Sequence, residues 1–447
     1  MEKFGTPKAP IFTHLELTRH CNLSCFYCTI RDNVSKSTPN LPVKHFKKIL
    51  DQLVKSEVFD VSFFGGEPFL YPHIYNLAMY AREKGLRVGF LSNGTLIKEK
   101  DLNRIKELFD IGTIALNGLE CVHDRLVGNP GMFRRTVHTI KELLGCDFPV
   151  AIDVLVSASS VDFFPNFMRW VAENLPKINA IFINCFVPYG DLPSQEQLST
   201  TQRDLLFEVM DQHNKNEPLM NKIRLGTPIP FCLIPGKFAY LRKNCSAGWL
   251  SAAIDPLGDI RICPWSPDVL GNILVSDFKQ IWSNSEEIKQ FRSMKWLPQR
   301  SCKKCAFLSS CFGGCKVISS DPGHLAAKQW KPFVVSATIE KSFGEKNTTN
   351  QEISPATKYL LDPSLIIRKE EKGSIIYLKR QGSCYWCNDV ALRILQSMND
   401  GLGFEEIVKT MITLYETESA KIRNGVTQTV ILLEQIGAVQ RVISRAS

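Results

Sequence analysis

Apolar positions in the first part of the chain follow two alternating patterns. Short apolar runs bounded by turn residues predict strands at 11–18, 59–64, 86–91, 111–117, 148–156 and 178–184. The segments between them carry apolar residues at helical spacing, as Val43, Phe46 and Ile49 do within 43–54. Strands that alternate with helices in this way predict an α/β fold with a parallel sheet.

A second pattern follows near the C-terminus, after a polar stretch. Residues 319–358 are rich in Asn, Thr, Lys and Pro, which predicts a flexible linker. Beyond it, short apolar runs with a turn at Gly373 predict strands at 364–368, 374–378 and 383–387. Apolar stripes at helical spacing come next, the first after a capping Asn388 and the last before a stop at Gly437. This order predicts a small winged-helix-like α+β domain.

Composition narrows the class of protein. The chain has 447 residues, about three domains at roughly 150 residues each. A hydrophobic content of 44% and a charged content of 22% exclude a wholly disordered chain. No apolar run approaches the ~20 residues of a membrane span, and the N-terminus lacks the apolar stretch of a signal peptide, so a cytoplasmic protein is expected. The net charge of +9 suits an acidic peptide, a nucleic acid or no partner.

Fifteen cysteines are unusual for such a chain, and their clustering indicates metal ligands rather than disulfides. Cys21, Cys25 and Cys28 follow the first predicted strand with the spacing C-x3-C-x2-C. Three thiolates on one loop can hold three irons of a 4Fe–4S cube and leave the fourth iron open. From the spacing alone, a zinc site or three packing thiols remain alternatives.

Two further motifs follow the next two strands. Gly65-Gly66-Glu67-Pro68 comes after 59–64, and Ser92-Asn93-Gly94 comes after 86–91. Ligands of parallel sheets bind at the carboxyl ends of the strands, so both motifs are expected on the same rim as the cysteine loop. Together, these three motifs resemble the radical S-adenosylmethionine (radical SAM) superfamily over about residues 10–185.

The resemblance implies a partial (β/α)6 barrel in which the cysteine loop holds a 4Fe–4S cluster. The open iron binds the amino and carboxylate groups of SAM, and reductive cleavage of SAM gives a 5′-deoxyadenosyl radical that removes a hydrogen atom from the substrate. The resemblance further implies that the SAM amino group contacts Gly65, Gly66, Glu67 and Pro68. It places Ser92 and Asn93 near the ribose and carboxylate of SAM, and Tyr27 at the adenine.

One strand departs from the family pattern. Many relatives carry Ser-x-Asp-Gly after the fourth strand, where this chain has Ala115-Leu116-Asn117-Gly118. We therefore assign no SAM contact to this strand. The following residues His123, Asp124 and Arg125 are expected in a loop, where one of them could bond the cofactor or all could lie at the surface.

A second group of cysteines follows the barrel. Its pattern is C-x12-G-x4-C and then C-x2-C-x5-C-x3-C, and zinc is a physical alternative because C-x2-C also suits structural zinc. The pattern resembles the SPASM domain, which carries auxiliary iron–sulfur clusters in enzymes that modify peptides and proteins. The resemblance implies one cluster on Cys245, Cys263 and Cys315, and another on Cys302, Cys305 and Cys311.

Two ligand positions then remain open. Cys232 precedes Cys245 by thirteen residues and could complete the first auxiliary cluster. The cysteine usually found soon after Cys315 is missing, so the second cluster could have no protein ligand there or could use Asp321, His324, Cys384 or Cys387. Packing is the favoured interpretation of Cys384 and Cys387, and ordinary burial that of Cys121, Cys146 and Cys185.

The C-terminal segment resembles the PqqD-like element that recognises leader peptides. The resemblance rests on the hairpin, the run Gly382–Asn388 into a helix, the turn at Asn399–Gly401 and the ending Leu433–Gly437. It implies a leader that adds as a strand beside the hairpin and against the last helix. A DNA-binding winged helix is the alternative, but Lys421 and Arg423 do not make a dense basic stripe.

We therefore predict an enzyme that modifies a ribosomally made precursor peptide by hydrogen abstraction followed by crosslinking or oxidation. Its cofactors would be SAM, a 4Fe–4S cluster and one or two auxiliary clusters. Its partners would be the peptide and an electron donor such as a flavodoxin or ferredoxin, without membrane or nucleic acid. The alternatives are a sulfatase-maturase-like protein oxidase and a zinc-binding nucleic-acid regulator. The expected boundaries are a barrel at 1–225, a SPASM domain at 226–325, a linker at 326–354 and a peptide-recognition domain at 355–447.

Overall fold

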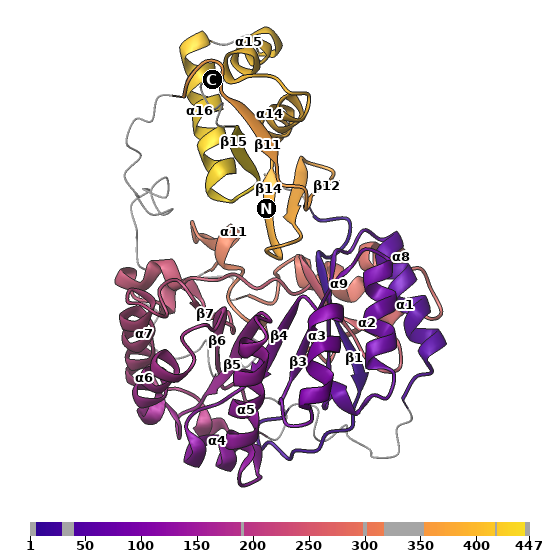
Figure 1. Ribbon diagram of the computed structural model, residues 1–447, viewed down its shortest axis with the longest axis vertical. Helices are drawn as coiled ribbons and strands as arrows, with labels where there is room; N and C mark the ends of the chain where they lie inside the picture. Colours follow the sequence, from indigo (N-terminus) through magenta and orange to yellow (C-terminus); the bar gives the residue numbers. More distant parts are fainter. Residues whose placement is uncertain are drawn as a thin grey trace. The chain divides into compact units, whose positions relative to one another are not determined.

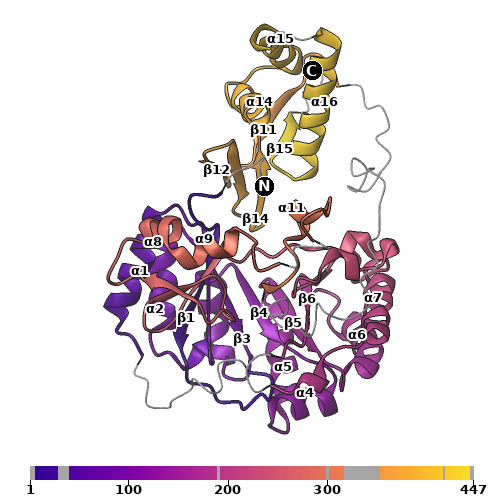
Figure 2. The same ribbon diagram turned by 180° about the vertical axis from the view of Figure 1, so that it is seen from behind.

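The computed structural model describes residues 6–28, 40–188, 192–297, 302–316, 353–415 and 418–442. The chain divides into two compact units (Figures 1 and 2). The larger unit is Ala9–Val334, and the smaller unit combines Met1–Lys8 with Val335–Ser447. The expected border between barrel and SPASM domain falls inside the larger unit and stays a prediction. Asp321, His324 and nearly all of the expected linker lie outside the described residues.

A ten-stranded sheet forms the centre of the larger unit, in the order β10-β9-β8-β1-β2-β3-β4-β5-β6-β7. The strands are β1 (Phe12–Thr18), β2 (Asp60–Gly65), β3 (Arg87–Ser92), β4 (Ile111–Ala115), β5 (Val150–Val156), β6 (Ala180–Cys185), β7 (Ile223–Leu225), β8 (Ser251–Ile254), β9 (Asp259–Arg261) and β10 (Val269–Asn272). Pairing is parallel from β8 through β1 to β7, and antiparallel at β9 and β10. The predicted α/β class with a parallel sheet is confirmed, and β1–β6 form where the pattern predicted strands.

Helices cover the outer face of the parallel strands (Figure 1). They are α1 (Val43–Lys55), α2 (Ile74–Glu83), α3 (Leu102–Leu108), α4 (Glu120–Val127), α5 (Met132–Gly145), α6 (Phe164–Asn174) and α7 (Thr200–Asn214), with α8 (Phe278–Asn284), α9 (Glu286–Arg292) and α11 (Leu308–Cys311) further along the chain. Helix α4 contains His123, Asp124 and Arg125, so the expected loop at these residues is wrong. The helix ends at Gly128, whose φ of 72° is typical of a glycine at a helix C-terminus.

The two faces of the sheet differ in burial. Leu15, Ile152 and Ile183 lie on one face and are 0% exposed. Their neighbours on the opposite face, such as His14 and Asp153, are only half-buried. Side chains alternate between the faces of a strand, so one set packs against the helices and the other lines the inside of the curved sheet. The strands thereby offer polar side chains to a ligand in the interior of the barrel.

The smaller unit has two antiparallel sheets and three helices among its described residues. Strand β11 (Lys358–Leu361) pairs with β15 (Val439–Val442), and β12 (Leu365–Lys369), β13 (Ser374–Leu378) and β14 (Ser383–Cys387) form the other sheet. The helices are α14 (Asp389–Asn399), α15 (Phe404–Leu414) and α16 (Ser419–Gln435). The predicted hairpin, third strand and helices are present, whereas the β11–β15 pair was not predicted.

Local signals explain where these helices begin and end. Asn388 Oδ1 accepts a hydrogen bond of 2.8 Å from the backbone N–H of Ala391 at the start of α14. Gly437 follows α16 with a φ of 74°, a conformation that favours glycine. Their apolar faces meet in a core that includes Ile394, Ile407 and Val430, each 0% exposed. No helix among the described residues is long and apolar enough to cross a membrane.

Candidate functional site

The cysteine loop after β1 is held against the end of α4. The backbone N–H groups of Ser24 and Phe26 donate to the carbonyls of Val127 and Leu126, at 3.3 and 3.2 Å. A Cβ atom on Gly128 would lie 3.1 Å from the carbonyl oxygen of Ser24. Glycine at the end of α4 therefore allows both the helix stop and the close approach of the loop.

The three thiols of the loop are close enough to influence one another. Burial raises the pKa of Cys25 to about 12, and the thiols of Cys21 and Cys28 contribute to the increase. Burial also raises the pKa of Cys21, with a contribution from Cys28. Cys21 is exposed and Cys25 and Cys28 are half-buried, and neighbouring thiolates repel one another unless a positive centre such as a metal cluster binds them. The donor set therefore fits the cluster that the C-x3-C-x2-C spacing implies.

The Gly65–Pro68 motif lies directly on the backbone that leads into the cysteine loop. Gly66 donates to the Thr18 carbonyl at 2.8 Å, and Glu67 donates to the His20 carbonyl at 2.7 Å. A Cβ on Gly65 would lie 2.2 Å from the Thr18 oxygen, and one on Gly66 would lie 2.2 Å from the His20 oxygen. Both glycines are therefore required because two backbone segments touch where their side chains would be.

The Glu67 side chain joins its own motif, Gly65–Pro68, to the motif Ser92–Gly94. It is 0% exposed, and its Oε1 accepts hydrogen bonds from Ser92 Oγ at 2.8 Å and from the Phe69 N–H at 3.2 Å. Its Oε2 accepts from the Asn93 N–H at 2.9 Å. Burial raises the pKa of Glu67 to about 7, against the lowering effect of these donors. Glu67 thus positions the end of β3, and its expected contact with the SAM amino group stays a prediction.

A ring of amide and hydroxyl groups joins Ser92-Asn93-Gly94 to the cysteine loop. Asn93 Nδ2 donates to Asn22 Oδ1 at 2.9 Å, and Asn22 Nδ2 donates to Thr95 Oγ1 at 2.8 Å. Thr95 returns a bond of 2.7 Å from its hydroxyl to Asn93 Oδ1. Sequence reasoning missed Asn22 and Thr95, although each lies next to a residue of a recognised motif.

The fourth strand also meets the cysteine loop. Asn117 Nδ2 donates to the Tyr27 hydroxyl at 2.6 Å, and Asn117 Oδ1 accepts from the Leu155 N–H at 2.9 Å. His123 Nδ1 accepts from the Asn117 N–H at 3.1 Å, and burial lowers the pKa of His123 to about 4. The neutral His123 ring therefore supports Asn117, which in turn orients Tyr27 of the cysteine loop.

The interior face carries polar groups that sequence reasoning did not identify. Asn184 Nδ2 donates to Asp153 Oδ1 at 2.7 Å. Burial raises the pKa of Asp153 to about 6, while Asn184 and Lys243 act in the opposite direction. Burial, followed by the charge of Lys243, lowers the pKa of His14 to about 4. These strand residues differ from their apolar neighbours, which is the one signal that could have found them, and they place acid–base groups inside the barrel.

The first auxiliary group contains the three cysteines that the SPASM resemblance implied. Burial raises the pKa of Cys245 and of Cys263 to about 12, and Cys315 is the strongest charged contributor to both shifts. The structure therefore brings Cys245, Cys263 and Cys315 together from segments far apart in the chain.

The second auxiliary group has Cys232 in its surroundings. The thiols of Cys302, Cys305 and Cys311 lie near enough to one another that Cys305 and Cys311 raise the pKa of Cys302, and Cys305 raises that of Cys311. Burial raises the pKa of Cys232 to about 11, and the charged contributors are Cys311, Cys302 and Cys305 rather than Cys245. The suggested place of Cys232 in the first group stays a prediction, and the N–H of its neighbour Phe231 contacts Cys311 of the second group. Within the described residues, no three ligating side chains are close enough to hold a single metal ion.

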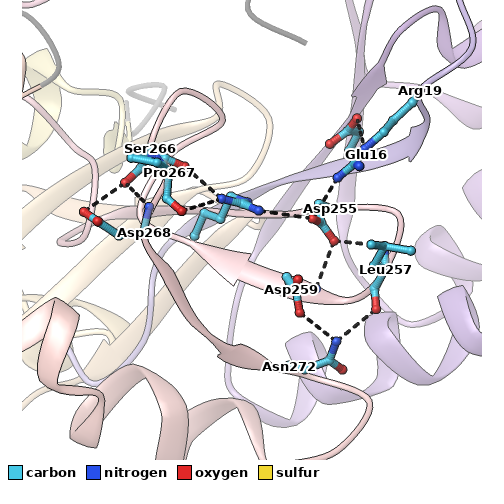
Figure 3. A network of polar contacts seen from close by, with 10 residues as sticks. Glu16, Arg19, Asp255, Leu257, Asp259, Ser266, Pro267, Asp268 and Asn272 are labelled. Atoms are coloured by element: carbon cyan, nitrogen blue, oxygen red, sulfur yellow. Dashed lines mark hydrogen bonds and ion pairs between the residues drawn. The ribbon is translucent and has the colours of Figure 1, made fainter. Parts of the chain in front are cut away.

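A polar network connects β1 with the auxiliary segment (Figure 3). Arg19 Nη2 donates to Asp255 Oδ2 at 3.0 Å, and Arg261 Nη2 lies 3.5 Å from the same oxygen. Arg261 also donates to the Pro267 carbonyl at 2.8 Å. Asp268 in the same network forms a 2.7 Å bond with Lys316, the residue after Cys315. The segments that carry the barrel cysteines and the first auxiliary group are therefore linked by charged contacts.

Four other cysteines lie in helices and strands of the two units. Cys121 is exposed on α4, and Cys185 is buried at the end of β6, where burial raises its pKa to about 12. In the smaller unit, Cys384 and Cys387 occupy opposite faces of β14, and Cys387 packs in the core. The arrangement of these two residues agrees with packing thiols and gives them no common ligand direction.

Comparison with known proteins identifies the two cysteine regions. Residues 15–158 match the radical SAM superfamily, and residues 245–306 match the iron–sulfur cluster-binding domain called SPASM. This chain has the radical SAM fold. It contains a radical SAM domain and a SPASM domain, and these two matches imply bound SAM and 4Fe–4S clusters.

In the aligned regions, about a quarter of the residues are identical between this chain and its curated relatives. The AdoMet-dependent heme synthase of Methanosarcina barkeri is 24% identical over 332 residues, which are 68% of this chain and 91% of the relative. The PqqA peptide cyclase of Bradyrhizobium diazoefficiens is 26% identical over 334 residues, 70% of this chain and 83% of the relative. The subtilosin biosynthesis protein AlbA of Bacillus subtilis is 28% identical over 333 residues, 70% of this chain and 69% of the relative.

Solved structures share the fold. SuiB from Streptococcus suis bound to SAM superimposes with a TM-score of 0.58 at 21% identity, over 69% of this chain and 74% of SuiB. SuiB bound to its precursor peptide SuiA gives a TM-score of 0.57 at 20% identity, over 70% of this chain and 73% of SuiB. At this identity, the likeness establishes the fold alone.

Proposed function

We propose that this radical SAM enzyme modifies a ribosomally synthesised precursor peptide by crosslinking or oxidation. The observation that carries the proposal is the joining of the three motif loops around Cys21, Cys25 and Cys28, together with two auxiliary thiol groups in the same unit. Two relatives, PqqA peptide cyclase and AlbA, and the structural neighbour SuiB act in the processing of such peptides according to their names.

Each group of residues in the site would have its own role in the reaction. Cys21, Cys25 and Cys28 would hold the cluster, whose bound SAM supplies the 5′-deoxyadenosyl radical. The rim motifs would orient SAM through Tyr27 and the backbone of 65–68. Asp153 and its neighbours would hold or accept a proton inside the barrel, where the raised pKa of the Asp153 carboxyl suits proton transfer near neutral pH. The auxiliary groups would take up the surplus electron of an oxidation, and a flavodoxin or ferredoxin would supply the initial electron.

The smaller unit would bind the leader of the peptide as a PqqD-like module at residues 355–447. In the described sheet, β12 and β14 each pair only with the central strand β13, so both outer edges can accept another strand. Ile367 on β12 is 38% exposed and Leu432 on α16 is 52% exposed, which gives apolar contacts near an edge strand and the last helix. Backbone pairing would give affinity, and apolar contacts would give specificity. Leader binding would raise the local concentration of the core peptide.

The charges of α16 favour a peptide ligand over DNA. Lys421 pairs with Glu418 at 3.1 Å, and Arg423 pairs with both oxygens of Glu405. A phosphate-binding helix needs cations that are free to reach the backbone of the nucleic acid. These two cations are instead held by acidic partners of the same unit.

The test uses the anaerobically reconstituted enzyme with a reductant, SAM and the peptide encoded beside its gene. We expect 5′-deoxyadenosine and a core peptide that has lost hydrogen by mass spectrometry. A leaderless version of the peptide should react much more slowly with the full-length enzyme. Equal reaction of both peptides would contradict the leader-binding role and favour a sulfatase-maturase-like oxidase. SAM cleavage that never alters the peptide would contradict the peptide-modifying function.

A further inference from the structure

The segment before Cys232 lies directly on the loop of the second auxiliary group. The Phe231 N–H donates to Cys311 Sγ at 3.3 Å. The same loop continues to Cys315 of the first group, whose N–H donates to the Pro228 carbonyl at 3.0 Å. A Cβ on Gly314 would lie 2.6 Å from Pro230 Cδ, so the two segments are packed without space between them.

The backbone at Cys232 is also fixed by its own turn. Phe231–Leu233 forms a short 3-10 turn in which the Leu233 N–H donates to the Pro230 carbonyl at 2.8 Å. The rings of Phe231 and Phe307 are 6.4 Å apart, and the Arg242 guanidinium lies 5.6 and 5.5 Å from the two ring centroids. Phe307 belongs to the stretch between Cys305 and Cys311. The turn that contains Cys232 therefore packs against that stretch.

We propose that Cys232 is the fourth thiolate ligand of the auxiliary cluster held by Cys302, Cys305 and Cys311. Four thiolates complete the ligand set of a 4Fe–4S cluster, and Cys232 would bind as the thiolate and release its proton to solvent. The Phe231 N–H next to Cys232 contacts Cys311 Sγ, and the thiols of Cys311, Cys302 and Cys305 lie near enough to Cys232 to affect its pKa. The ligand would thus come from upstream of the C-x2-C-x5-C run, in place of the missing cysteine downstream.

The assignment has a consequence for the first auxiliary group. Within the described part of the larger unit, Cys245, Cys263 and Cys315 then remain as its three thiolates. An iron in that group would lack a thiolate from this unit, and such an iron has a different potential and can bind another ligand. The two auxiliary clusters would therefore differ in kind. This inference concerns ligation alone and does not depend on the peptide substrate.

The first test compares auxiliary cluster signals in full-length protein with Cys21, Cys25 and Cys28 replaced by Ala. Electron paramagnetic resonance of the reduced protein defines one signal that is lost in Cys302→Ala and another that is lost in Cys245→Ala. We expect Cys232→Ala to change or remove the Cys302-dependent signal and to leave the Cys245-dependent signal as it was. Cys121→Ala, which alters another exposed cysteine, should change neither. If Cys232→Ala changes the Cys245-dependent signal or leaves both unchanged, the assignment is overturned.

A second measurement leaves Cys232 in place and so does not depend on the stability of its variant. The folded, cluster-loaded protein is alkylated briefly and its cysteines are read by mass spectrometry. We expect Cys232 to be protected in the wild type and in Cys245→Ala, but modified in Cys302→Ala, while Cys121 reacts in all three. Protection of Cys232 that is lost in Cys245→Ala and kept in Cys302→Ala would overturn the proposal, as would full reactivity in the wild type.

Discussion

Arg19 and Asp255 are joined by a hydrogen-bonded ion pair of 3.0 Å across 236 residues of sequence. Arg19 stands two residues before Cys21, and Asp255 stands in the turn that leads through Gly258 to Cys263. Asp255 Oδ1 also accepts the backbone N–H groups of Leu257 and Asp259, at 2.9 and 3.0 Å (Figure 3). One buried carboxylate therefore shapes the auxiliary turn and attaches it to the strand that carries the cysteine loop.

Replacement of Asp255 should strongly destabilise the larger unit. Its side chain is 4% exposed, and Asp255→Ala would leave Arg19 and two backbone donors without their acceptor. Breaking a buried pair of this kind costs about 3–5 kcal/mol. Denaturant unfolding of the apo protein measures the loss. Asp268→Ala removes a 40% exposed carboxylate from the same network and should cost less than about 1 kcal/mol. Equal losses in the two variants would contradict a special role for Asp255.

Glu67→Gln should weaken the junction between the second and third motifs. A glutamine amide has one oxygen and a donating NH2 group, so it cannot accept all three bonds from Ser92, Phe69 and Asn93. A buried donor left without an acceptor costs about 1–3 kcal/mol. We expect that loss in unfolding free energy, together with weaker SAM binding by equilibrium dialysis. The exposed Glu83→Gln serves as the control and should leave both quantities unchanged.

Gly66→Ala should disrupt the site by steric overlap, without removing any hydrogen-bonding group. The added Cβ would meet the His20 carbonyl at 2.2 Å, and backbone atoms on both sides cannot move independently. Overpacking of this kind costs about 3 kcal/mol, and sometimes more. Iron content after reconstitution and unfolding free energy should both fall. Gly145→Ala near the end of α5 meets no atom within 4 Å and should be neutral or slightly stabilising, because alanine favours the helix.

Asp153 should give the apo protein a measurable pH dependence. Burial raises its pKa from 3.8 to about 6, so between these values the folded protein binds more protons at this site than the unfolded chain. The free energy of unfolding should therefore fall as the pH rises from about 4 to about 6, and the contribution of Asp153 should be constant above that range. The full shift corresponds to roughly 3 kcal/mol, an upper value for a half-buried group.

Asp153→Asn isolates this contribution from that of the other carboxyl groups. Its unfolding free energy, measured by denaturant titration across the same pH range, should lack the Asp153 component of the slope. The unfolding free energy of the wild type minus that of the variant should rise as the pH falls from about 6 to about 4. It should not change with pH above about pH 6. A wild type that instead loses stability relative to the variant as the pH falls from about 6 to about 4 would show that the carboxyl is stabilised in its charged form, contrary to the effect of burial.

The sequence by itself determined strands β1–β6 and the rim of the site. Cys21-x3-Cys25-x2-Cys28, Gly65–Pro68 and Ser92–Gly94 each follow a recognisable strand, and parallel strands carry their C-terminal ends to one edge. Apolar runs of period two or 3.6 depend on neighbours within the same segment, so they are readable without the fold. The helix cap at Asn388 and the stop at Gly437 are local in the same sense.

Only the tertiary structure decided which distant groups meet. Arg19 and Asp255 carry no local mark of their pairing, and Asp153 is one acidic residue among many until the fold places it inside the barrel. Cys232 shows the difference most clearly, because its distance from Cys245 along the chain suggested one partner group, whereas the N–H of its neighbour Phe231 contacts Cys311 of the other group. Sequence spacing constrains neighbours of a few residues, whereas the contacts of a turn such as 231–233 are set by the segments that pack around it.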